Sequence, residues 1–335
     1  MKKNKMLRIA SILLVVTLLS TCVISGTFAK YVTKAEGEDH ARVAKWGVLV
    51  TVEGGVFADK YKATDEDYLE AEGQYSVEAF AEEGKTPDQV VAPGTNSTQV
   101  GTTMKATVTG KPEVAARYSI TASGIEDVVL KAGTYTDYTQ LVKAEDGTYG
   151  YTNTFTLKKD YAPIKWDMKI SKGSTTYKVT ELLYNKLPAN YLAIAENYGL
   201  TPNGCSLTDA IEIIKKVAGN DGYKNIVEAA LGQVVSGGRN FMLEVDQETG
   251  DITLSYDFDP NKDMGFSFEL YWTWLFDEET DGAKVMGTVN GGTEEVNVVD
   301  MADTYLGNVA AGVVTDDNAK TTIAASFIAS ATQID

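Results

Sequence analysis

An alternation of apolar and polar residues that recurs along the chain constrains its fold more than any other feature. The longest example places Phe266, Phe268, Leu270, Trp272, Trp274 and Phe276 at every second position. The cleanest runs through Ile164, Trp166, Met168 and Ile170, with Lys165, Asp167 and Lys169 between them. Successive side chains of a β-strand point to opposite faces, so this period predicts strands with one buried face.

Further alternating segments and their turn residues extend the prediction to most of the chain. Strands are expected at 46–52, 100–123, 241–258 and 323–331. Turn-forming residues predict hairpins over 100–123 and 164–182, and the loop DPNKDMG predicts another between the strand ending at Phe258 and the aromatic stripe. The acidic residues 58–86 are expected to form an exposed insertion. The expected fold is therefore all-β and antiparallel, with 46–335 as a single β-sandwich domain.

Helical periodicity is confined to residues 187–235. Pro188 opens a first helix that Gly199 ends, Ser206 caps a second that ends at Gly219, and a third covers Asn225–Gly232. We expect one helical insertion that covers a sheet face or the end of a barrel. A ligand-binding lid is the alternative interpretation.

The first 29 residues have the pattern of a secretory signal peptide. A basic start at Lys2, Lys3, Lys5 and Arg8 precedes an apolar run from Ile9 to Ile24. Small residues at Thr27 and Ala29 predict cleavage between Ala29 and Lys30, which leaves 30–45 as a flexible or strand-donating N-terminal segment. Leu19-Ser20-Thr21-Cys22 approximates a lipoprotein box, so lipid attachment at Cys22 is the alternative.

The charge of the chain limits its partners. The 335 residues carry a formal charge of −17, and removing 1–29 leaves 26 Lys and Arg against 47 Asp and Glu, or −21. Such a chain repels nucleic acid and anionic membranes, and we expect no stable membrane insertion after cleavage. Cys205 is the one cysteine after the signal, so no intramolecular disulfide can form.

Two segments resemble a known family. Ser25-Gly26-Thr27-Phe28-Ala29-Lys30-Tyr31, followed by Asp39-His40-Ala41-Arg42-Val43-Ala44-Lys45-Trp46, is similar to the SipW-type signal and mature start of the TasA and camelysin-like proteins secreted by Gram-positive bacteria. Residues 92–124 resemble that family's Pro-Gly turn followed by two strands. The resemblance implies a jelly-roll-like β-sandwich in a biofilm matrix or surface fibre, secreted with the help of a dedicated signal peptidase.

The resemblance also implies how copies would associate. In that family the segment after the cleavage site inserts into the next subunit by donor-strand complementation. The matching positions are Lys30 to Val43, continuing toward Trp46, with Tyr31, Val32, Val43 and Trp46 as the residues of the assembly segment. A strand that pairs within its own subunit, or a disordered tail, is the alternative.

Catalytic constellations are missing from the sequence. His40 is the one histidine and no HExxH occurs, so the metallopeptidase label of some relatives has no support. Cys205 precedes the Ser206 cap, where a helix N-terminus is expected to lower a thiol pKa, but no histidine accompanies it. We predict a noncatalytic structural protein that self-associates. A carbohydrate- or protein-binding module is the second hypothesis.

One weak metal candidate occurs in the sequence. Asp257, Asp259, Asn261 and Asp263 alternate as at the start of a calcium loop. Lys262 stands where that loop has glycine, and Phe268 stands where it has glutamate. A hairpin tip rich in turn formers explains the same residues. We therefore predict no cofactor, with calcium as the alternative.

Overall fold

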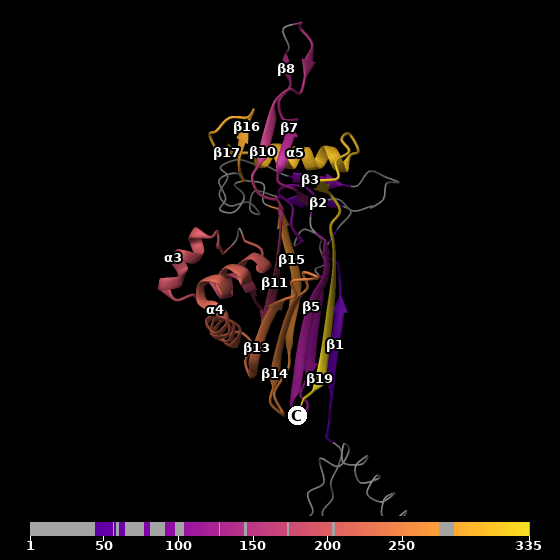
Figure 1. Cartoon of the computed structure of the whole chain (residues 1–335). Helices are drawn as coiled ribbons and strands as arrows, with labels where there is room; N and C mark the ends of the chain where they lie inside the picture. The colour runs from indigo at the N-terminus through magenta and orange to yellow at the C-terminus, as the bar shows by residue number, and fades with distance from the viewer. Residues whose placement is uncertain are drawn as a thin grey trace, which may run out of the picture. The chain divides into compact units, whose positions relative to one another are not determined.

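The computed structural model (Figure 1) describes residues 44–55, 57, 60–63, 77–80, 91–97, 104–126, 128–143, 146–172, 174–202, 205–274 and 285–334. Lys45–Asp335 forms one compact unit. Every strand pairing in it is antiparallel. No described helix is both long and apolar enough to cross a membrane.

The aromatic stripe lies at the centre of a five-stranded sheet. The strand order is β1 (Val48–Glu53), β4 (Lys105–Gly110), β15 (Phe266–Trp274), β11 (Ile164–Lys172) and β12 (Thr175–Lys178). The register places Trp166 opposite Trp272, and Met168 opposite Leu270. The two strongest alternating segments are therefore neighbours, and their apolar residues share one face.

A four-stranded sheet faces this one. Its order is β13 (Gly238–Val245), β14 (Ile252–Phe258), β5 (Ala116–Glu126) and β19 (Ala324–Gln333). The expected C-terminal strand is thus present, and it pairs with β5. Ladder pairing of β5 on both sides makes it an inner strand of the sheet.

Aromatic rings from the two sheets meet in the core. The ring centroid of Phe268 on β15 lies 6.0 Å from that of Tyr118 on β5 and 6.0 Å from that of Tyr256 on β14. Phe258 and Phe266 stack across the same space at 6.2 Å. All five rings are buried. The predicted all-β antiparallel sandwich is therefore confirmed.

Two expected hairpins are wrong. β4 pairs with β1 and β15, whereas β5 pairs with β14 and β19, so the turn at Lys111-Pro112-Glu113 passes the chain from one sheet to the other. The loop after Phe258 does the same for β14 and β15. Each of these strands buries its apolar face by packing it against the opposite sheet, because the core of a β-sandwich lies between the faces of two sheets.

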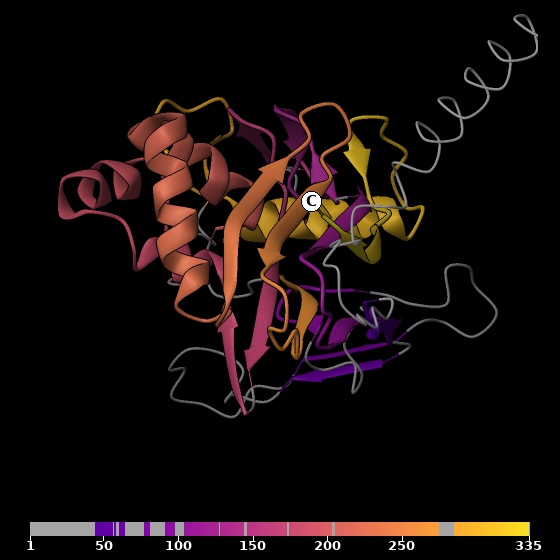
Figure 2. The same ribbon diagram turned by 90° about the horizontal axis from the view of Figure 1, so that it is seen from below.

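The helical insertion begins earlier than expected. Its helices are α2 (Val179–Tyr184), α3 (Ala189–Asn197) and α4 (Leu207–Gly232), so the strand expected to return through 182 ends at Lys178. Ser206 caps α4 as predicted, because its Oγ accepts a hydrogen bond from the Asp209 backbone N–H at 3.1 Å. Gly219 interrupts α4 with φ 70° and ψ 171°, at the position predicted for a helix end. Figure 2 shows these helices to one side of the sheets.

A third large sheet, at one end of the sandwich (Figure 1), was not anticipated. A four-stranded sheet with the order β17 (Val296–Asn297), β16 (Met286–Val289), β10 (Thr154–Leu157) and β7 (Gly133–Thr136) packs with helix α5 (Val299–Ala310). Tyr305 on α5 contacts Tyr135 at 4.8 Å and Phe155 at 6.3 Å between ring centroids. Three two-stranded ladders complete the described elements: β2 (Lys60–Ala63) with β3 (Val77–Phe80), β8 (Val142–Lys143) with β9 (Tyr149–Gly150), and β6 (Val129–Leu130) with β18 (Ala319–Lys320).

A buried carboxylate joins α5 to the sandwich. The Tyr161 hydroxyl donates to Asp303 Oδ1 at 2.6 Å, and Trp274 Nε1 donates to Oδ2 at 3.3 Å. Burial raises the pKa of Asp303 to about 7, the two donors oppose that rise, and Asp300 adds to it. Burial likewise raises the pKa of Asp167 on β11 to about 6.

These raised pKa values predict that the fold loses stability as pH rises. The native state holds a proton on Asp303 that the unfolded chain releases near pH 4, so this contribution is fully present below about pH 4 and is lost by about pH 7. We expect Asp303→Asn to unfold with a smaller difference between pH 5 and pH 8 than the parent protein in thermal melts. An equal change in melting temperature between pH 5 and pH 8 in the two proteins would contradict this role of Asp303, since the other titrating groups are the same in both.

Candidate functional site

The sandwich has four edge strands, and their outer sides differ. The five-stranded sheet ends at β1 and β12, and the four-stranded sheet ends at β13 and β19. β1 and β19 lie side by side on one flank of the sandwich, and neither pairs with a further described strand (Figure 1). An edge strand of this kind presents backbone N–H and C=O groups that another strand can bind.

The hydrogen-bonding side of β19 can be derived from its ladder. The backbone N–H of Ile334 donates to the C=O of Ala115 at 3.0 Å, so residues at even positions from 328 to 334 direct their backbone groups toward β5. Ala329 and Ala331 therefore direct theirs away from β5. This edge of β19 is able to receive a strand.

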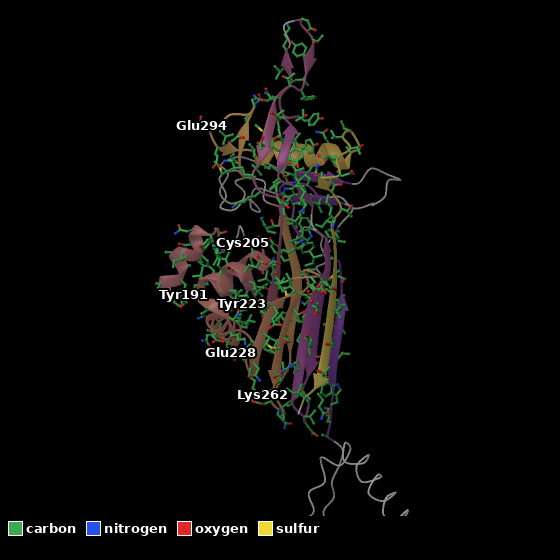
Figure 3. All side chains as sticks on the ribbon, in the orientation of Figure 1. Tyr191, Cys205, Tyr223, Glu228, Lys262 and Glu294 are labelled. Atoms are coloured by element: carbon green, nitrogen blue, oxygen red, sulfur yellow. The ribbon has the colours of Figure 1, made fainter. Side chains whose placement is uncertain are left out.

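The edge of β13, in contrast, is covered by α4. The Tyr223 hydroxyl donates to the C=O of Leu243 at 2.6 Å, and Glu228 Oε2 accepts from the N–H of Phe241 at 2.9 Å. Figure 3 shows both side chains beside the strand. Two backbone groups that a further strand would need are thus bound by side chains of the helix. Helix α4 blocks strand addition at this edge, which is one way that sheets avoid uncontrolled pairing.

This cover leads to a prediction about association. We expect Tyr223→Phe combined with Glu228→Ala to expose backbone groups of β13 and to promote lateral association in light scattering and sedimentation. Tyr184→Phe is the matched control, because the hydrogen bond that it removes joins Tyr184 to Glu196, both within the helical region. A double variant that associates no more than the control would show that α4 does not guard the edge.

The entry to β1 is fixed to the sandwich. The backbone N–H of Lys45 donates to Glu113 Oε2 at 2.8 Å, and the N–H of Glu113 donates to the C=O of Lys45 at 2.8 Å. Gly110 has φ +133°, and a Cβ there would overlap the carbonyl oxygen of Gly47. Trp46, the last residue of the expected assembly segment, is partly buried against the core. The chain thus enters β1 along a defined path.

Most residues of the expected N-terminal sites lie outside the described residues. These are the cleavage residues Ala29 and Lys30, the assembly residues Tyr31, Val32 and Val43, and also Cys22 and His40. Their roles stay predictions. The described part of the assembly segment is its end, where Trp46 leads into β1.

The four residues of the calcium candidate each have another partner. Asp257 is buried and accepts from Arg117 Nε at 2.7 Å and Nη2 at 3.1 Å, and also from Asn240. Asp259 pairs with Arg239, Asp263 accepts from the backbone of Gly265, and the N–H of Asn261 donates to Pro112. Among the described residues, no group of three or more His, Cys, Asp or Glu is placed to hold a metal ion.

The thiol of Cys205 differs from expectation. It is buried, and burial raises its pKa to about 12, with Asp209 adding to the rise. The helix N-terminus was expected to lower this pKa, but desolvation of the thiolate outweighs it here. A thiol that stays protonated is a poor nucleophile.

One groove is hollowed between α4 and β13. It has a volume of about 560 Å³, and its lining includes Lys215, Lys224, Glu228 and Glu244. Sequence reasoning identified neither this groove nor the cover on β13, because both depend on how the helical insertion packs. The one sequence signal near the groove was Gly219, which predicted the break in the helix that forms one side of it.

The fold and its edges define the class: an antiparallel β-sandwich with adjacent outer strands at β1 and β19 and an edge at β13 that α4 covers. Comparison with protein-family models, with curated proteins and with solved structures gave no match to this chain.

Proposed function

We propose that the chain is a secreted, noncatalytic structural protein, a subunit of an extracellular matrix or surface fibre. In this proposal the segment after the cleavage site, from Lys30 to Val43, adds as a strand to the next copy. The acceptor is the flank formed by β1 and β19. This is the function expected for the family that the N-terminal sequence resembles.

The observation that carries the proposal is the contrast between the two flanks. Helix α4 binds backbone groups on the edge of β13, while β1 and β19 lack a further described strand. Of the two outer strands of the four-stranded sheet, only β19 is suited to receive a strand without rearrangement. Strand addition restricted to one flank would give a linear polymer and not an aggregate that grows in several directions.

The donor would be joined to a firmly held point. Lys45 lies two residues after the end of the proposed donor segment at Val43, and its backbone is fixed by Glu113. A strand donated to another subunit needs such an anchor, because tension along the fibre would otherwise unpair β1. The buried thiol of Cys205, with its raised pKa, favours a noncatalytic role.

A second candidate function is an extracellular carbohydrate- or protein-binding module. The groove between α4 and β13 favours it. The two functions can coexist, because β13, which lines the groove, and β19, the proposed acceptor, are the two opposite edges of the four-stranded sheet.

The test combines N-terminal sequencing of the protein from culture medium with negative-stain microscopy of the same material. The proposal expects a chain that begins at Lys30 and forms filaments. A chain recovered only inside cells, or a secreted chain that stays monomeric at high concentration, would overturn it.

A further inference from the structure

The groove between α4 and β13 has walls that are fixed before any ligand binds. One wall is the helix on both sides of its break at Gly219, and the other is the strand. The hydrogen bonds of Tyr223 to Leu243 and of Glu228 to Phe241 join the two walls along their length. A site held in this way loses little conformational entropy on binding.

The size and floor of the groove suit a small ligand. Its volume of about 560 Å³ falls in the range of small-molecule sites. Tyr223, Val227, Phe241 and Leu243 line it and are buried, so they give an apolar floor. The exposed residues of the lining are polar apart from Met242, and Asn220 and Asn225 are among them.

The charges around the groove balance. Lys215 and Lys224 oppose Glu228 and Glu244, and the lining contains no other charged residue. A phosphate or another anion would meet two carboxylates here within a chain of charge −17, and a cation would meet two ammonium groups. The lining therefore favours a neutral ligand that can both donate and accept hydrogen bonds.

An extended peptide is a poor fit to this site. It would have to pair with the outward backbone groups of β13, but the C=O of Leu243 and the N–H of Phe241 are already bound by α4. A ladder cannot form past these two positions. A ligand that binds through side chains of the lining avoids that conflict.

We propose that this groove binds a neutral saccharide the size of one or two sugar rings. Amide groups of Asn220 and Asn225, together with the lysine and glutamate side chains of the lining, would bind the hydroxyl groups, and the apolar floor would contact the less polar face of the ring. The inference is independent of strand addition, because the groove lies at the other edge of the sheet.

The test is isothermal titration of the purified full-length chain with cellobiose, maltose and N,N′-diacetylchitobiose at millimolar concentrations. At least one of them is expected to bind. Asn225→Ala should weaken that binding about fivefold, as expected for the loss of a neutral hydrogen bond. Asn197→Ala on α3 is the matched control, since Asn197 is exposed and lies outside the groove.

A blocking variant guards against an indirect effect. Asn220→Trp should fill the groove and abolish binding, whereas Asn197→Trp should not, with circular dichroism checking that both are folded. The proposal is overturned if none of the three disaccharides binds, if binding survives Asn220→Trp, or if charged comparators such as digalacturonic acid or a chitosan dimer bind more tightly. Filament formation should be unchanged in all four variants, so failure here is distinguishable from failure of the proposed fibre function.

Discussion

Deletion of residues 30–43 from the mature protein is expected to abolish filaments while leaving a folded monomer. The compact unit begins at Lys45, and the two hydrogen bonds between Lys45 and Glu113 remain in the shortened chain. If the deleted segment is the donated strand, its loss removes the backbone hydrogen bonds between copies. Negative-stain microscopy measures the filaments, and circular dichroism with thermal melts measures the fold.

A second variant tests the acceptor side of the same contact. Ala331→Pro removes an N–H that is directed away from β5, so the ladder between β19 and β5 stays intact while the outer edge loses a donor. Ala331→Val keeps the N–H and is the matched control. Filaments that persist after the deletion would contradict strand addition. Filaments lost with the deletion but kept with the proline would move the acceptor to β1.

Phe268→Ala is expected to cause a large loss of stability. Phe268 is fully buried on the central strand β15, and its ring contacts Tyr118 and Tyr256 of the opposite sheet. Removing it leaves a cavity between the sheets and should cost about 3–5 kcal/mol of unfolding free energy. Urea unfolding monitored by tyrosine and tryptophan fluorescence measures this difference.

The control for this prediction is Phe268→Leu, which keeps part of the buried volume. It should cost less, about 1–2 kcal/mol, because fewer carbons leave the core. If Phe268→Ala lowers the free energy of unfolding by less than about 1 kcal/mol, the urea midpoint and the slope of the transition will be nearly unchanged. That result would mean that the two sheets move together to fill the cavity, or that the ring does not hold them together.

The strands of the core could be predicted because their pattern is local. Phe266 to Trp274 and Ile164 to Ile170 alternate strictly, and the structure places both in the centre of one sheet with their apolar faces together. The Ser206 cap and the break at Gly219 were also correct, since each depends on the chemistry of one or two residues.

Pairing was predicted less well because it is not local. Short connections at Pro112 and after Phe258 resemble hairpin loops, but strands that are amphipathic in the same way can pair edge to edge or pack face to face. The helix α5 was missed for a different reason. Its buried residues, Val299, Ala302, Tyr305 and Leu306, have helical spacing, but they lie outside the residues 187–235 to which helices were assigned.

The sequence by itself determined the main strands of the two core sheets, which face of each is apolar, roughly where the helical insertion lies, and that the chain has the pattern of a secreted protein. The tertiary structure decided which strands are neighbours, which edges are covered and which are exposed, and that the thiol of Cys205 is buried with a raised pKa. The physical reason is that periodicity records burial one residue at a time. Edges, grooves and shifted pKa values arise from contacts between segments as distant as Glu228 and Phe241 or Tyr161 and Asp303, which no local pattern contains.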